Sequence, residues 1–148
     1  MPCPSGADLN QDIDAYRARG VDTLVSMLAD DEAALLGLSD EQVVCADAGI
    51  SFVSFPIVDF GLPDRDAFAA LIQRIAGMLR AGRNVAVHCR AGIGRSGMVT
   101  AATLIALGYE ASKAVESVSA SRGTSIPDTV EQGRFIAEFA HHKSYRLS

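Results

Sequence analysis

Short apolar runs alternate along this chain with longer segments whose apolar residues recur at three- and four-residue spacing. The short runs are typical of buried strands, and the periodic segments are typical of helices that bury one face. Strands are expected over 21–28, 50–58 and 85–88, and helices over 8–19, 30–36, 39–48, 64–81, 96–107, 112–121 and 127–140. The alternation predicts a three-layer α/β domain with a small, mostly parallel central sheet flanked by helices.

The whole chain, 1–148, is expected to form one domain, because its length suffices for one buried core and no repeat or linker interrupts the pattern. The helix 96–107 is apolar on nearly every side, which predicts that it lies buried at the centre. Ser39 followed by Gln42 matches a capping box and predicts a helix start at Ser39. The tail, 141–148, is expected to be frayed.

Composition and charge exclude several classes of function. The net charge is −5 and no block of Lys and Arg is present, so neither a nucleic-acid interface nor adsorption to an anionic membrane is expected. No apolar run reaches membrane-spanning length and no signal peptide is evident, which predicts a cytoplasmic protein without membrane insertion. Cys3, Cys45 and Cys89 lack metal-ligand spacing, and their odd number fits a reducing compartment. No metal site is therefore expected.

The residues with the clearest chemistry lie where the strand 85–88 leads into the helix 96–107. The connecting sequence reads His-Cys-Arg-Ala-Gly-Ile-Gly-Arg-Ser-Gly over 88–97. Unpaired N–H groups at a helix start, together with the helix dipole, make such a loop an anion site. A Cys89 thiol facing these groups and Arg95 should ionise readily, and the same donors would hold a phosphate dianion. The alternative is a buried cysteine beside a surface arginine in an ordinary turn.

This pattern, H-C-x5-R-S-G, resembles the signature loop of the cysteine-based protein tyrosine phosphatases, in their dual-specificity branch. The resemblance extends over about 20–140 and implies a sheet of four or five strands, although only three are evident in the sequence. It implies that Cys89 attacks phosphorus to give a cysteinyl-phosphate, without any metal or organic cofactor. The residues implied to bind the phosphate are Arg90, Ala91, Gly92, Ile93, Gly94 and Arg95.

The resemblance also assigns roles to the two polar residues that border this loop. His88 is similar to the family histidine that orders the loop and tunes the thiolate. Ser96 is similar to the hydroxyl residue that donates a hydrogen bond to the departing thiolate. A plain helix cap is the alternative for Ser96, because serine is favoured at that position in any helix.

A leaving oxygen needs a proton, so a general acid is required as well. The sequence Phe-Pro-Ile-Val-Asp-Phe-Gly-Leu-Pro-Asp over 55–64 resembles the acid loop of the kinase-associated phosphatase group, which makes Asp59 the candidate acid. Asp59 would then act as a base towards water in the second step. Asp64 is the competitor, but it follows Pro63 at a helix start, where the dipole favours the carboxylate over the acid.

Three further residues are candidates for accessory roles. The segment 125–132 resembles one that lines the pocket in dual-specificity enzymes, where Gln132 could steer the hydrolytic water; a surface glutamine is the alternative. Arg90 could add charge at the pocket rim or simply be solvated. Cys3 could approach the pocket mouth and form a disulfide with Cys89. Cys45, by contrast, is expected in the core.

The function implied is that of a phosphomonoester hydrolase whose partner is a phosphorylated protein, with phosphotyrosine and also phosphoserine or phosphothreonine as substrates. A phosphoinositide, inositol phosphate or nucleotide is the alternative substrate, since the segment around Ile126 also resembles the lipid phosphatase branch. Neutral Ala91 and Ile93 argue against a multiply charged substrate. A phosphate-binding module would need no thiol, and a rhodanese-type sulfur carrier would need neither Arg95 nor an acid. The sequence predicts no oligomeric state.

Overall fold

The computed structural model describes residues 1–142. Every element predicted from the sequence is present within them, in the predicted order. The helices are α1 Leu9–Ala18, α2 Asp30–Leu35, α3 Glu41–Asp47, α4 Arg65–Arg80, α5 Arg95–Ala106, α6 Ala111–Arg122 and α7 Val130–His141; the strands are β1 Thr23–Ser26, β2 Ser51–Ser54 and β3 Val85–His88. Most of the tail that was expected to be frayed lies outside the described residues, and His141 closes α7.

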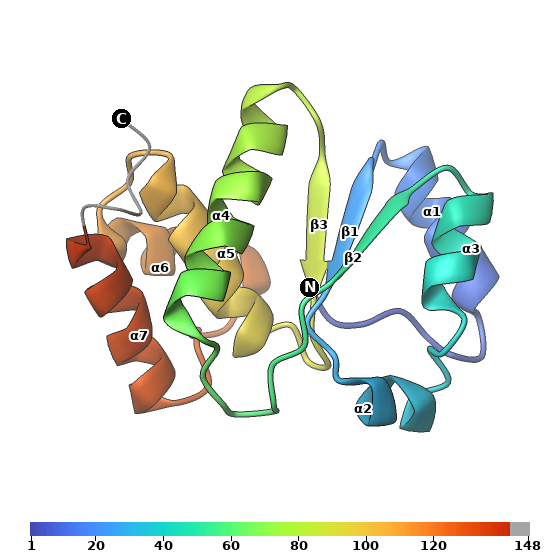
Figure 1. The fold of residues 1–148 in the computed structure, drawn as a ribbon, viewed down its shortest axis with the longest axis horizontal. Helices are drawn as coiled ribbons and strands as arrows, with labels where there is room; N and C mark the ends of the chain where they lie inside the picture. The colour runs from blue at the N-terminus through green and yellow to red at the C-terminus, as the bar shows by residue number, and fades with distance from the viewer. Residues whose placement is uncertain (143–148) are drawn as a thin grey trace.

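The sheet is parallel, with strand order β2-β1-β3. In Figure 1, α1 and α3 lie on one side of the sheet and α4 to α7 on the other, so the predicted three-layer architecture is confirmed. Four or five strands were implied, but residues 1–142 form only three. The N-terminal segment runs beside the end of β3, where the Cys3 N–H donates to the Arg90 carbonyl oxygen, without becoming a regular strand.

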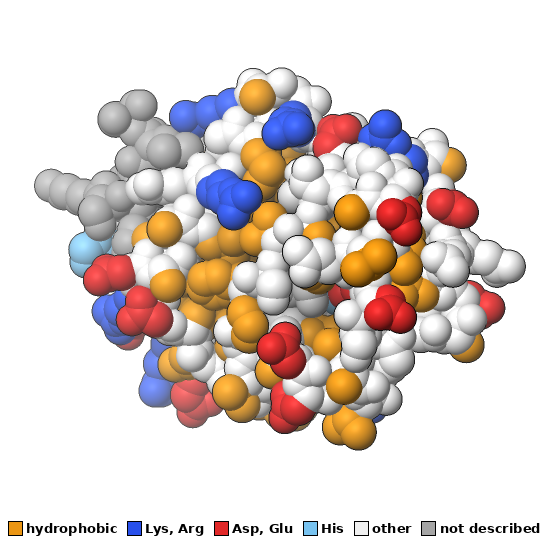
Figure 2. All heavy atoms as spheres, turned by 45° about the vertical axis from the view of Figure 1, so that its right-hand side comes forward, with side chains coloured by type: hydrophobic (Ala, Val, Ile, Leu, Met, Phe, Trp, Pro, Cys, Tyr) orange, Lys and Arg blue, Asp and Glu red, His pale blue; other side chains and the backbone are white. Residues whose placement is uncertain are grey.

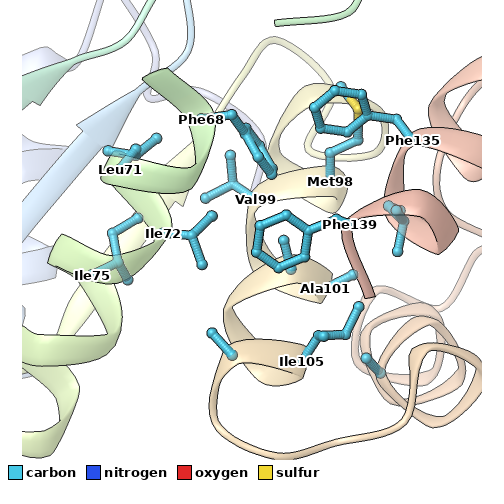
Figure 3. Close-up of a cluster of buried hydrophobic side chains, with 14 of the residues drawn as sticks. Phe68, Leu71, Ile72, Ile75, Met98, Val99, Ala101, Ile105, Phe135 and Phe139 are labelled. Carbon is cyan, nitrogen blue, oxygen red and sulfur yellow. The ribbon is translucent and has the colours of Figure 1, made fainter. Parts of the chain in front are cut away.

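The larger core lies between the sheet and the helices α4 to α7. Ten of the twelve residues of α5 are buried, as its apolar composition predicts. Figure 3 shows Phe68 of α4 facing Phe135 and Phe139 of α7. The Phe68 ring meets these rings edge-to-face, with centroids 4.9 and 5.7 Å away, a geometry worth about 1 kcal/mol per pair beyond burial. Met98 and Val99 of α5 belong to the same core, which holds α5, and therefore the loop before it, in the middle of the domain.

Two predicted helix starts are wrong. The capping box of Ser39 and Gln42 does not form, because a turn in which the Glu41 N–H donates to the Leu38 carbonyl oxygen delays α3 until Glu41. Helix α7 begins at Val130 rather than near 127, because a capping box of Thr129 with Gln132 sets its first turn. These helix starts place Glu41 in the first turn of α3 and Gln132 in the first turn of α7, and both side chains are buried.

The carboxyl ends of the three strands point toward the lower edge of Figure 1, where α2, the segment 55–64 and the start of α5 meet. Charged side chains of both signs are scattered over the face shown in Figure 2, without a broad basic patch. Among residues 1–142, no helix is both long and apolar enough to cross a membrane.

Candidate active site

The loop between β3 and α5, residues 89–94, is called the nucleophile loop below. Cys89 is 3% exposed, and its Sγ accepts the Gly92 N–H at 3.2 Å and lies 3.2 Å from the Ser96 Oγ. Burial raises the pKa of the Cys89 thiol. Hydrogen bonds from Ser96 and from the loop backbone outweigh burial, so the pKa of Cys89 is lowered overall. The structure thus places a readily ionised thiol where the sequence places the nucleophile.

Four consecutive carbonyl groups of this loop are held from outside. The Arg90 oxygen accepts the Cys3 N–H, and Arg122 donates to the Ala91 oxygen at 3.2 Å and to the Gly92 oxygen at 3.0 Å. The Cys89 oxygen lies 3.1 Å from Nδ1 of His88. In a trans peptide the N–H points away from the carbonyl oxygen, so the following N–H groups turn to the opposite, inner side. Local sequence patterns give no sign that Arg122, on α6, holds this loop.

Arg95 is buried at 2% exposure, at the first position of α5. Its Nη1 and Nη2 donate to the two carboxylate oxygens of Glu32 at 2.6 and 2.9 Å, and Nη1 also donates to the Ile57 carbonyl oxygen at 3.0 Å. The Asp59 Oδ1 lies 3.2 Å from Nη2. Within residues 1–142, the Nε of Arg95 has no carboxylate or carbonyl partner, so its N–H remains available to an anion.

Glu32 is the residue in this group that the sequence reasoning missed. Its place in the acidic first turn of α2 suggests only a residue that stabilises the helix start, whereas its carboxylate binds the Arg95 guanidinium. The hydrogen bond from Arg95 lowers the pKa of Glu32, which keeps the carboxylate ionised beside the guanidinium. Since 62 residues separate the two along the chain, only tertiary structure reveals the pair.

The two candidate acids occupy different environments. Asp59 lies in the loop before α4, with its side chain 43% exposed, and its Oδ1 also accepts the Phe60 N–H at 3.1 Å. Asp64 is the N-cap of α4 and accepts the Ala67 N–H at 2.9 Å. Of the two carboxylates, Asp59 is the one that the structure brings next to Arg95.

Gln132 does not lie on the helix surface, so that alternative is wrong. Its side chain is fully buried, and its Oε1 accepts the N–H groups of Asp128 and Thr129. Its Nε2 donates to the Gly61 carbonyl oxygen at 3.3 Å, which ties the start of α7 to the loop that carries Asp59. The Asp128 carboxylate and Gln132 Oε1 both lie against Gly94, leaving no room there for a side chain.

Among the remaining candidates, Arg90 is exposed at the rim of the nucleophile loop. Cys3 lies beside this loop, and all three cysteines are free thiols, so no bond joins Cys3 to Cys89 in this structure. Cys45 is fully buried in the smaller core under α1 and α3, as expected. Within residues 1–142 there is no cluster of His, Cys, Asp and Glu that could hold a metal ion.

Comparison with known proteins identifies similar sequences. A family model described as "Tc-R-P: Polymorphic toxin system, DSP-PTPase phosphatase" matches residues 2–109. Cyclin-dependent kinase inhibitor 3 of Rattus norvegicus is 31% identical over 102 residues, which cover 68% of this chain and 48% of that protein. Protein tyrosine phosphatase domain-containing protein 1 of Mus musculus is 31% identical over 123 residues, 77% of this chain and 16% of that protein. The chain thus spans half or less of the length of these relatives.

Similar folds occur among solved structures. A kinase associated phosphatase with its catalytic-site cysteine replaced by serine superimposes with a TM-score of 0.85 at 22% identity, covering 93% of this chain and 79% of that one. Tk-PTP in its active form gives a TM-score of 0.80 at 25% identity, covering 96% and 90%. PTPMT1 in complex with PI(5)P gives 0.76 at 22% identity, covering 95% and 87%.

Proposed function

Because the chain belongs to the DSP-PTPase phosphatase family, we propose that it hydrolyses phosphomonoesters through a cysteinyl-phosphate, with phosphotyrosine in proteins as its main substrate. The observation that carries this proposal is the Cys89 thiol, whose pKa is lowered by N–H and hydroxyl donors at the foot of a helix that begins with a buried arginine. Such a thiol is a nucleophile beside an anion site, which is the combination that the reaction needs.

In the first step the Cys89 thiolate attacks phosphorus, so that the S–P bond forms as the bond to the leaving oxygen breaks. Inward N–H groups of the nucleophile loop hold the phosphate oxygens, together with Nε and Nη2 of Arg95. Asp59 contacts Nη2 in the structure. A phosphate oxygen that takes this position releases Asp59, whose carboxylic acid form then protonates the leaving oxygen.

In the second step a water molecule attacks phosphorus and the S–P bond breaks. Asp59, now a carboxylate, takes the proton from the water, and inorganic phosphate leaves. The Ser96 hydroxyl, 3.2 Å from Sγ, donates a hydrogen bond to the departing thiolate and so stabilises it. Gln132 is buried between α7 and the Asp59 loop, which favours a role in holding that loop over one in steering water.

The charges around the nucleophile loop favour a singly phosphorylated peptide over a multiply charged substrate. Arg90 is the exposed cation within the loop, while Asp59 and Asp128 place carboxylates beside it. A polyanionic head group would meet these carboxylates at close range. A monophosphorylated phosphoinositide is the second candidate, because the fold is similar to that of PTPMT1, whose solved complex contains PI(5)P.

A substrate panel tests the proposed function. Phosphate release should be measured from a simple aryl phosphate, from peptides that differ only in phosphotyrosine or phosphothreonine, and from soluble PI(5)P. The phosphotyrosine peptide is expected to give the highest kcat/KM. A higher value for PI(5)P would replace the protein substrate with the lipid. No release from any of them, with phosphate still bound, would show a phosphate-binding module.

A cytoplasmic setting is proposed too, because the Cys89 thiol must stay reduced to act as the nucleophile.

Replacing Glu32 with alanine is expected to raise KM for an aryl phosphate about tenfold, because the Arg95 guanidinium loses the carboxylate that orients it. Steady-state kinetics and the Kd of inorganic phosphate measure the effect. Asp30→Ala is the matched control, since it removes a carboxylate from the same helix and should keep KM within about twofold. An unchanged KM and Kd in Glu32→Ala would contradict the orienting role.

A further inference from the structure

A buried carboxylate that the proposed mechanism does not use lies on the far side of His88. Glu41, the first residue of α3, is 3% exposed, and its Oε2 lies 2.6 Å from Nε2 of the fully buried His88. Burying a carboxylate is costly unless a partner offsets its charge. The titratable groups that face Glu41 from other elements are the Tyr16 hydroxyl of α1 and the Cys3 thiol, besides Cys45 on α3 itself.

None of these three neighbours is a cation. Burial is the largest cause that raises the pKa of Tyr16 and the pKa of Cys45 to about 12 in each case. The charges of Asp12 and Glu41 contribute for Tyr16, and the charge of Glu41 contributes for Cys45. Burial and the Glu41 charge act on Cys3 as well, whose pKa is also raised. All three groups therefore stay neutral, and His88 is the neighbour that can share a proton with Glu41.

The hydrogen-bond partners of His88 determine where its protons lie. Nδ1 is 3.1 Å from the Cys89 carbonyl oxygen, and a carbonyl oxygen can only accept, so Nδ1 carries a proton. Nε2 faces a carboxylate oxygen at 2.6 Å, so one proton lies between them, on either atom. In both arrangements the pair is neutral overall and Nδ1–H donates to the Cys89 carbonyl oxygen.

We propose that Glu41 is a positioning residue for the nucleophile loop: it holds the His88 ring so that Nδ1–H fixes the Cys89 carbonyl group. The peptide that follows Cys89 is trans, so fixing its oxygen outward turns the Arg90 N–H to the inner side of the loop, where a phosphate would bind. A fixed Cys89 peptide also holds the start of the loop whose Gly92 N–H donates to the thiol sulfur, so Glu41 helps to maintain that donor. The effect on catalysis rests on the proposed function, whereas the effect on His88 does not.

Glu41→Leu and Glu41→Gln separate this role from packing and from charge. Leucine leaves Nε2 of His88 without a partner, whereas a glutamine amide can donate to Nε2 and retain the proton on Nδ1. In Glu41→Leu, kcat/KM for an aryl phosphate should fall about tenfold, which corresponds to the net free energy of about one hydrogen bond. The acidic limb of its pH profile should move to higher pH, because a thiol with weakened donors ionises later. Glu41→Gln should keep kcat/KM and the acidic limb of the pH profile near those of the wild type.

A spectroscopic readout tests the inference without turnover. Two-bond proton–nitrogen NMR correlations of the three histidines, assigned with His88→Asn, report which ring nitrogens carry protons. The wild type should show a slowly exchanging proton on Nδ1 of His88. In Glu41→Leu, where the ring loses its second partner, this proton should exchange faster, and in Glu41→Gln it should exchange as slowly as in the wild type. Leu38→Ala is the matched control: it removes buried volume from the same small core and should change neither this signal nor the acidic limb.

Three outcomes would overturn the inference. The first is a wild-type His88 without a proton on Nδ1, which decides the matter even if Glu41→Leu does not fold. The second is a Glu41→Leu protein whose His88 signal and pH profile match the wild type. The third is a Glu41→Gln protein that shifts as far as Glu41→Leu, which would mean that Glu41 acts by its charge. Inactivity of the wild type on every phosphate ester would refute the proposed function instead, with the NMR result still interpretable.

Discussion

Replacing Cys89 with serine is expected to reduce phosphate release at least about 1,000-fold, because a serine hydroxyl in place of the ionised thiol is a far weaker nucleophile. The inward N–H groups and Arg95 do not depend on sulfur, so the Kd of inorganic phosphate should change little. Release from an aryl phosphate and calorimetric phosphate binding are the two measurements.

Cys45→Ser is the matched control for this substitution. Cys45 is fully buried in the smaller core, away from the nucleophile loop. The control should lower the melting temperature, because it buries a hydroxyl, and it should retain turnover. Substantial turnover in Cys89→Ser would exclude the covalent route. Loss of phosphate binding together with turnover would mean that the thiol shapes the anion site as well.

Replacing Asp59 with alanine is expected to slow hydrolysis of an alkyl phosphate about 100-fold, because its poor leaving group depends on the donated proton. The phenolate of an aryl phosphate with an acidic phenol leaves without that proton, so kcat for this substrate should fall less than about tenfold. Comparison of kcat for the two substrates measures the difference.

Asp64→Ala distinguishes the two candidate acids. Asp64 caps α4 through the Ala67 N–H, so this variant should lose about 1 kcal/mol of stability. Its ratio of aryl to alkyl rates should stay that of the wild type. A leaving-group-dependent loss in Asp64→Ala, but not in Asp59→Ala, would transfer the role of the acid to Asp64.

The fold was predictable because its elements carry local signals. Apolar residues at three- and four-residue spacing over 64–81 identify α4, and the nearly all-apolar segment 96–107 identifies α5. The structure places both helices as expected. The nucleophile loop was predictable for the same reason, since Cys89 and Arg95 lie six positions apart in one turn between β3 and α5. The two wrong helix starts reflect competing local hydrogen bonds, which favour Glu41 and Val130.

The partners of the loop were not predictable, because they come from distant parts of the chain. Glu32 resembles any acidic residue at a helix start, and Glu41 resembles a surface glutamate until it meets His88. Arg122 lies at the end of a helix, where a basic residue is favoured in any case. Each acts through a contact made only in the folded chain, so the sequence predicts the reacting groups better than the groups that hold them.

The outward bonds to the loop carbonyl groups imply that the anion site is a property of the whole tertiary structure. Their donors come from the N-terminal segment, from α6 and from the ring of His88, which α3 supports in turn. A ten-residue peptide of 88–97 would contain the signature but lack these supports, and its amide groups would face water at random. Partial opening of any one supporting segment would therefore remove the site well before the domain as a whole unfolds.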